Sequence, residues 1–328
     1  MDKQRDLSID LIKFIAVLLI INSHADICYP RYSFLATGGA IGDALFLFCS
    51  GYTLFWGQLT RFDNWYKKRV SRIYPSVFAS LILMCVLGFE NVGGISLTAA
   101  LGGEFIIAIM CYYILLYLCQ RYFRNNLSLV LFADVIVTIV AYMSFPYKYE
   151  TGENGIYGIS TLFRWIPYFA MMLIGAWIGL KRKNGTLSVR AGVPDTILLL
   201  MCVGVFYGIQ MLAKYNPSVG PWQIITLPFL AGIVYYMWKC SHSAIFRRIY
   251  SNRVCNRIIL IAGGLCLESY LVQFYIFTDR LNHLFPLNIF IIIIAVLILA
   301  YVCRCLARLL LQTFRTEPYD WAKIISLC

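Results

Sequence analysis

Lys13 and His24 stand at the two ends of one apolar segment, KFIAVLLIINSH, and both side chains can do chemistry. At 3.6 residues per helical turn their separation is about three turns, so both face the same side of a helix. They then lie roughly 16 Å apart along its axis. A lysine and a histidine on one stripe of a membrane helix are costly, which is typical of a functional site. The alternative is a lysine that reaches the lipid headgroups and a histidine that is satisfied at the opposite interface.

Arg69 and Arg72 form a second pair, within the segment FDNWYKKRVSRIYP. They are three residues apart, so on a helical turn they share a face. A guanidinium fork matches the oxygens of a phosphate, and paired arginines at a membrane boundary therefore suit a phosphate ligand. The alternative is a set of topology-determining charges that contact lipid headgroups.

The composition predicts membrane helices as the elements that position these residues. The chain has 328 residues, of which 60% are hydrophobic and 13% charged, with a mean hydropathy of +0.73. A soluble domain is closer to half apolar and a quarter charged. We expect one transmembrane domain over residues 1–328, with a short cytoplasmic tail at about 307–328. The net charge of +12 comes from basic residues in short loops, a pattern that argues against nucleic acid as a partner.

The apolar runs predict an all-α, polytopic membrane protein with about ten transmembrane helices. The runs cover residues 7–26, 41–59, 73–89, 102–119, 128–144, 162–180, 193–212, 222–238, 258–278 and 287–306. The first run is long and polar at its end, without a small-residue cleavage site, so it is expected to be a retained span and not a cleavable signal peptide.

Basic residues alternate from loop to loop. They gather before the first run, at 59–72, 121–124, 181–190 and 239–257, and in the tail at 304–323. The intervening loops hold only Arg31, Lys148, Arg164, Lys214 and Arg280. By the positive-inside rule both termini are predicted to be cytoplasmic.

This topology places Lys13 toward the cytoplasm and His24 toward the outer face. Asp10 lies three residues before Lys13, so the two are expected to pair and lower the cost of burial. Asp43 begins the second run near the level of His24. Close to it, Gly42, Ser50 and Gly51 are small residues whose expected role is close helix packing.

Three further acids, Glu104, Asp134 and Glu268, lie in or at the edge of apolar runs and could pair with basic groups or serve a relay. His242 and His283 are expected to be solvated loop residues. The twelve cysteines lie mostly inside apolar runs without metal-ligand spacing, so we expect small buried hydrophobes and no metal site.

These motifs together resemble the acyltransferase-3 family of integral membrane acyltransferases. The matching segments are the Arg/Lys-x10-His motif at Lys13 and His24 after SIDLIK, the Phe-rich FLFCSGY with Ser50 and Gly51, and RVSRIYP with Arg69, Arg72 and Pro75. A fourth segment, GLCLESYLVQ, has Glu268, Tyr270 and Leu271 in place. It carries Cys266 and Gln273 where the family often has Ser and His.

The resemblance implies an enzyme that moves an acyl group, acetyl being expected, from cytoplasmic acyl-CoA to a hydroxyl of an extracytoplasmic glycan or glycolipid. The protein would then lie in a bacterial cytoplasmic membrane and have membrane lipid, acyl-CoA and the acceptor as partners. Acyl-CoA would be a co-substrate, with no tightly bound cofactor.

The residue roles follow from the same resemblance. His24 would be the catalytic residue, as a general base toward the hydroxyl or as a transient acyl carrier. The CoA phosphates would be bound by Arg69, Arg72 and Lys13. Supporting roles are expected for Asp10, Asp43, Ser50, Glu268 and Tyr270.

Two alternatives stay open. A transporter or flippase for an anionic lipid or glycan would use the same residues as a binding path, with flux but no covalent change of its cargo. A catalytically inactive homologue would serve as an assembly partner.

Overall fold

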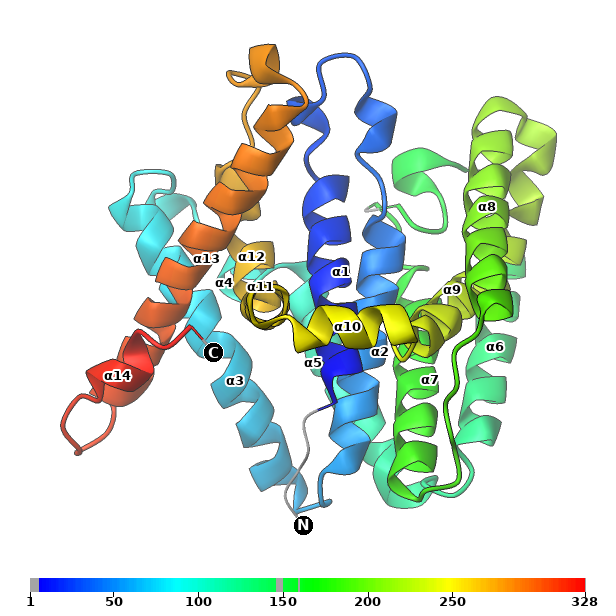
Figure 1. The fold of residues 1–328 in the computed structure, drawn as a ribbon, viewed down its shortest axis with the longest axis horizontal. Coiled ribbons are helices and arrows are strands. Elements are labelled where there is room, and N and C mark those ends of the chain that lie inside the picture. Colours follow the sequence, from blue (N-terminus) through cyan, green and yellow to red (C-terminus); the bar gives the residue numbers. More distant parts are fainter. Residues whose placement is uncertain (1–5, 146–149, 159, 328) are drawn as a thin grey trace. The chain divides into compact units, whose positions relative to one another are not determined.

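A computed structural model describes residues 6–145, 150–158 and 160–327, and all regular elements in these ranges are helical (Figure 1). The α-helices are α1 (Leu7–Ser23), α2 (Gly39–Trp56), α3 (Phe62–Val86), α4 (Leu97–Ala100), α5 (Glu104–Tyr122), α6 (Leu127–Ser144), α7 (Trp165–Lys183), α8 (Val193–Tyr215), α9 (Thr226–Cys240), α10 (Ala244–Ser251), α11 (Arg253–Gly264), α12 (Cys266–Val272), α13 (Leu287–Thr313) and α14 (Trp321–Ile324). Lys148, one of the predicted outer basic residues, lies outside the described residues, as do the basic residues before position 6.

Each of the ten predicted runs coincides with a helix. Among the described residues, seven helices are long and apolar enough to cross a membrane: α2 with the turn before it, α3, α5, α6, α8, α9 with the 3-10 helix η6 (Pro217–Ile225), and α13. The ninth run forms α11 and α12 with η7 (Gln273–Tyr275), bent by 57°, and would be an eighth span if the bent pair counts as one. The protein is therefore an all-helical, multi-pass membrane protein, while the count of ten and the side of the termini stay predictions.

The first and sixth runs do not reach that length and apolarity. α1 has 17 residues, fewer than the about 20 needed to cross the hydrocarbon core. α7 is longer, but its last turn holds Lys181, Arg182 and Lys183.

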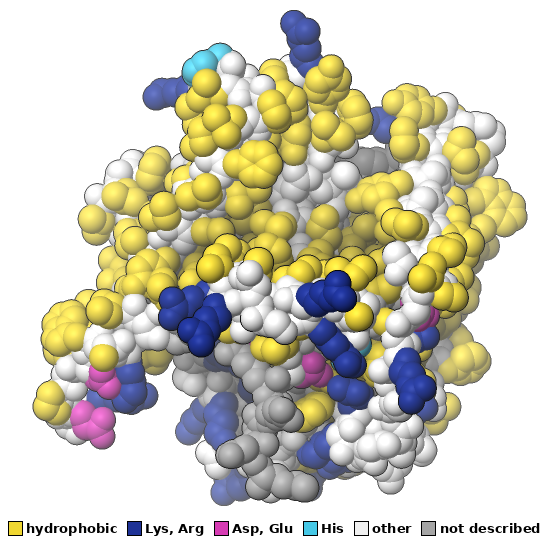
Figure 2. All heavy atoms as spheres, in the orientation of Figure 1, with side chains coloured by type: hydrophobic (Ala, Val, Ile, Leu, Met, Phe, Trp, Pro, Cys, Tyr) yellow, Lys and Arg dark blue, Asp and Glu magenta, His cyan; other side chains and the backbone are white. Residues whose placement is uncertain are grey.

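The exposed face of α13 shows why these helices suit lipid. Phe290, Ile294 and Ile298, at four-residue spacing, are 62%, 57% and 60% exposed. The opposite stripe of α13, which includes Ile292 and Val296, is buried. Figure 2 shows hydrophobic side chains over the visible face of this helix. A helix that is apolar all round is stable only when lipid or protein covers every face.

The chain divides into two compact units whose segments alternate along the sequence. Unit 1 comprises Met1–Ile12, Asp43–Leu59 and Leu115–Asn256, and unit 2 comprises Lys13–Gly42, Thr60–Ile114 and Arg257–Cys328.

Unit 1 is built on close contact between the backbones of α2 and α7. A Cβ on Gly51 would overlap the carbonyl of Met172, and a Cβ on Gly175 would overlap that of Phe48. Glycine on both helices removes the side chains that would hold the two backbones apart. The predicted packing role of Gly51 is thereby confirmed. In unit 2 the same holds for Gly42, where a Cβ would lie 2.7 Å from the Ile20 side chain on α1.

Unit 2 is built on three helices, because α13 packs along α3 and α12 packs against both. α3 begins at Phe62, well before the predicted start at residue 73, so the predicted loop carrying Arg69 and Arg72 is helical. The long polar stretch hides this start, since its apolar content falls below that of a membrane span. α13 likewise continues past the predicted end at 306, to Thr313.

Candidate active site

His24 lies in unit 2, in the turn directly after α1, whose last residue is Ser23. Its amide donates to the carbonyl of Ile21 at 3.3 Å, so the chain turns out of the helix at this point. The imidazole packs on Phe274 of η7, with ring centroids 4.8 Å apart. His24 is half-buried, at the point where α1 gives way to a loop.

A set of asparagines fixes the loop that follows His24. Asn22 donates from Nδ2 to the carbonyls of Leu35 and Thr37, at 2.7 and 2.9 Å. Farther along the chain, Asn288 of α13 is buried and donates from Nδ2 to the carbonyl of Cys28 at 2.7 Å. Sequence reasoning missed these residues, although an asparagine at the end of an apolar run is the signal that could have found them.

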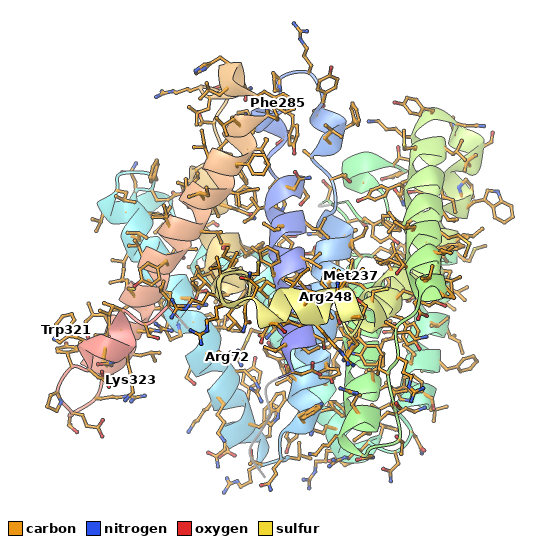
Figure 3. All side chains as sticks on the ribbon, in the orientation of Figure 1. Arg72, Met237, Arg248, Phe285, Trp321 and Lys323 are labelled. Atoms are coloured by element: carbon orange, nitrogen blue, oxygen red, sulfur yellow. The ribbon has the colours of Figure 1, made fainter. Side chains whose placement is uncertain are left out.

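Arg69 and Arg72 lie one turn apart on α3, as their spacing predicts. Figure 3 labels Arg72 on this helix. The Arg69 guanidinium stacks over the Trp65 ring, 4.7 Å from its centroid, and Trp65 is itself buried. Arg69 Nε is buried and has no hydrogen-bond partner within the described part of the chain. The aromatic ring therefore stacks on one face of this guanidinium and leaves its Nε donor for another group.

Glu268 lies in a buried polar cluster that joins three helices. It forms an ion pair with Arg304 of α13 at 2.7 Å and accepts a hydrogen bond from the Ser76 hydroxyl of α3 at 2.9 Å. Arg304 also donates to the carbonyl of Gly264, at the bend between α11 and α12. The sequence left the partner of Glu268 open and placed Arg304 in the cytoplasmic tail. The structure places Arg304 inside α13, with its side chain only 16% exposed.

The face of α3 that meets Glu268 also carries the arginine pair. Arg69, Arg72 and Ser76 follow the i, i+3, i+7 spacing of one helix face. Arg72 and Arg69 are roughly 6 and 10 Å from Ser76 along the helix axis. Beyond Glu268, the chain of α12 and η7 leads to Phe274, the residue in contact with His24.

The remaining predicted residues are divided between the units. Lys13 belongs to unit 2, half-buried on α1, and Tyr270 packs its ring on Phe105, with centroids 5.3 Å apart. Asp10, Asp43 and Ser50 belong to unit 1. Within unit 1 the charge of Arg164 acts on the Asp43 carboxylate, and Asp10 is buried. The Asp10–Lys13 ion pair stays a prediction.

His242 differs from its predicted role as a solvated loop residue. It is half-buried after α9, and its Nδ1 lies 2.9 Å from the carbonyl of Trp238. Burial lowers the pKa of His242, so the neutral imidazole is favoured. His283 is exposed, as predicted.

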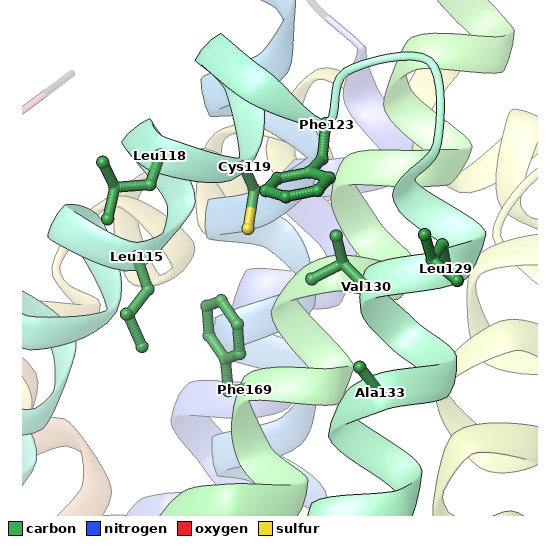
Figure 4. Close-up of a pocket in the computed structure, with 8 residues that line it drawn as sticks. All are labelled: Leu115, Leu118, Cys119, Phe123, Leu129, Val130, Ala133 and Phe169. Carbon is green, nitrogen blue, oxygen red and sulfur yellow. The ribbon is translucent and has the colours of Figure 1, made fainter.

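An apolar cavity of about 360 Å³ lies within unit 1, between α5, α6 and α7 (Figure 4). Leu118, Phe123, Val130 and Phe169 are among its lining residues, and no predicted site residue is among them. Within the described ranges, no three His, Cys, Asp or Glu side chains come close enough to hold a metal ion.

The apolar helices, with a histidine, an arginine pair and a buried ion pair in one helical unit, define a multi-pass membrane protein with a polar site. Its family is shown by sequence: the model of the acyltransferase-3 family, described as an acyltransferase domain, matches residues 6–305. The chain belongs to this family and is an acyltransferase that transfers groups other than aminoacyl groups. Searches among curated proteins and among solved structures gave no significant match.

Proposed function

We propose that this membrane acyltransferase moves an acyl group, acetyl in the simplest case, from cytoplasmic acyl-CoA to a hydroxyl of an extracytoplasmic glycan or glycolipid. The observation that carries the proposal is the arrangement of unit 2. The Ser76–Glu268 hydrogen bond joins the arginine-bearing face of α3 to α12, and Phe274 joins the end of that segment to His24. These contacts support a path, through one set of packed helices, between the proposed phosphate site and the imidazole proposed as catalytic.

Acyl transfer over the distance between the arginine pair and His24 requires a long, thin acyl donor that carries its charge at the end away from the acyl group. CoA has its phosphates at one end and the thioester at the end of a flexible arm. Arg69 and Arg72, with Lys13, bind the phosphates by charge-assisted hydrogen bonds. The arm then extends along the packed helices, so that the thioester meets His24.

In the transfer step, neutral His24 accepts the proton of the acceptor hydroxyl as its oxygen attacks the thioester carbonyl carbon. The tetrahedral intermediate collapses by breaking the carbon–sulfur bond, and the CoA thiolate leaves and takes up the proton from the imidazolium. The products are an ester and free CoA. In the second form of the step, His24 attacks the thioester itself and carries the acyl group to the hydroxyl as an acyl-imidazole.

The direct test is transfer of labelled acetyl from acetyl-CoA by membranes that contain His24→Ala. General base catalysis is worth about 10²- to 10⁴-fold, so we expect at least a hundredfold loss of ester formation. His283→Ala is the matched control, because this histidine is exposed and should leave the rate unchanged. Undiminished transfer by His24→Ala would refute the assignment, and flux of a cargo without any ester formed would favour a transporter.

A further inference from the structure

Gln273 is buried in unit 2 with its side chain unsatisfied. It is 0% exposed, and in the described part of the protein neither Nε2 nor Oε1 has a hydrogen-bond partner. Ser269, one turn earlier, is 1% exposed and its Oγ is also without a partner there. Buried polar groups without hydrogen bonds destabilise the folded state, so native proteins rarely leave them unpaired.

The two residues share one face of the α12–η7 segment, because they are four positions apart. Glu268, which precedes Ser269, contacts α3, and Phe274, which follows Gln273, contacts His24. Along the chain, Ser269 and Gln273 therefore lie between the residue that contacts α3, which carries the arginine pair, and the residue that contacts His24.

We infer that Ser269 and Gln273 form a subsite for the amide-bearing pantetheine arm of the acyl donor. This inference rests on the proposed function, which requires the arm to run from the arginine pair to His24. The arm has two secondary amides, each with one N–H donor and one carbonyl acceptor.

The hydrogen-bonding capacities of Ser269 Oγ, Gln273 Nε2 and Gln273 Oε1 favour the amide groups of the arm, and not the thioester, as the bound group. Gln273 Oε1 only accepts hydrogen bonds, Nε2 only donates, and the Ser269 hydroxyl does both. Amide groups satisfy all three atoms. A thioester carbonyl only accepts, so it would leave Gln273 Oε1 unpaired.

The test combines Gln273→Leu with shortened donors. The donors are acetyl-CoA, S-acetyl-pantetheine, which keeps both amides but lacks the nucleotide, and ethyl thioacetate, which has no amide. Gln273→Leu removes two neutral hydrogen bonds to the arm, so we expect its KM to rise about tenfold for acetyl-CoA and for S-acetyl-pantetheine. Little change in kcat is expected, and the rate with ethyl thioacetate should equal that of the unchanged protein.

Two further variants complete the design. Ser269→Ala should show a smaller rise of the same kind. Gln210→Leu removes a glutamine from α8 in unit 1 and should leave all three donors unaffected. The thermal midpoint of each variant separates binding from folding, and Gln273→Leu should not lower it, because an unpaired buried amide is removed.

Three outcomes would overturn the inference: an unchanged KM for the two amide donors, an equal loss with ethyl thioacetate, or a lowered midpoint that accounts for the whole effect. An unchanged KM would mean that buried water satisfies these groups. Failure of the proposed function looks different, since the unchanged protein would then form no ester from acetyl-CoA at all.

Discussion

At the scale of single residues, the two arginines of α3 are not equivalent. Arg69 is half-buried and stacked on Trp65, whereas Arg72 is exposed. Stacking fixes the plane of the Arg69 guanidinium, and in the proposed phosphate site this would lower the entropy lost on binding. Lysine cannot take this role, because its ammonium has neither the plane nor the fork.

Removing both arginines should weaken binding of the nucleotide part of acetyl-CoA and leave binding of the pantetheine part unchanged. We expect Arg69→Gln with Arg72→Gln to raise the KM for acetyl-CoA roughly 10- to 100-fold, since a hydrogen bond to a charged group is worth about 1.5–3 kcal/mol. The KM for S-acetyl-pantetheine, which has no nucleotide, should stay unchanged. Steady-state kinetics with the two donors measures the difference.

Arg61→Gln is the control for this pair. It removes one guanidinium charge at the start of the same helix, where Arg61 is exposed and pairs only with Asp63 among the described residues. If the double variant lost activity equally with both donors, Arg69 and Arg72 would not be binding the phosphates of CoA.

The sequence indicated candidate site residues through their type and spacing. Lys13, His24, Arg69 and Arg72 could be found because their distances along the chain match helix periodicity. The partner of Glu268 could not be found, since Arg304 is far away in sequence and only tertiary packing brings the two together. The unsatisfied state of Gln273 was equally hidden, because burial of a single side chain has no periodic signature.

At the scale of elements, the contact of α2 with α7 gives unit 1 a sharp dependence on glycine. Gly51→Ala should lower the thermal midpoint in detergent, because the new methyl group would overlap the Met172 carbonyl and force the two helices apart. Overpacking of this kind typically costs about 1–3 kcal/mol.

Gly204→Ala is the matched control for this prediction. Gly204 lies in α8 of the same unit, and a Cβ there meets no atom within 4 Å. Alanine at this position should leave the midpoint unchanged or raise it, owing to its better helix propensity. Equal effects at the two glycines would contradict the close approach of α2 and α7.

The Glu268–Arg304 ion pair should behave as a buried pair that joins α12 and α13. Glu268→Gln or Arg304→Met alone leaves one charged partner uncompensated and should cost about 3–5 kcal/mol of unfolding free energy. The double variant should recover most of that loss, because no buried charge remains. Unfolding curves of the four proteins give the coupling, and additive losses would show that the pair does not stabilise unit 2.

Hydropathy predicted where the helices lie along the sequence, but it did not predict where they end or bend. The predicted runs all coincide with helices, since apolar residues must be covered by lipid or protein. The early start of α3 was missed because its first turns are polar. The 57° bend between α11 and α12 was missed because it falls inside a continuous apolar run, where only the Gly263–Gly264 pair marks the break.

At the scale of the whole molecule, each of the two units is built from three separate segments of the chain. The residues assigned to donor binding and to catalysis all belong to unit 2, while the apolar cavity and the α2–α7 contact belong to unit 1. Basic residues alternate between loops, and this pattern is the basis for expecting a donor on the cytoplasmic side and an acceptor on the other.

The measurement that tests the central claim most directly uses sealed membrane vesicles of known orientation that carry a glycan acceptor. Labelled acetyl-CoA is supplied at the cytoplasmic face alone, and alkali-labile label on the glycan is measured at the opposite face. The account predicts label with the unchanged protein and with His283→Ala, and at least a hundredfold less with His24→Ala. Equal labelling with His24→Ala, or esterification confined to the face that receives the acetyl-CoA, would contradict it.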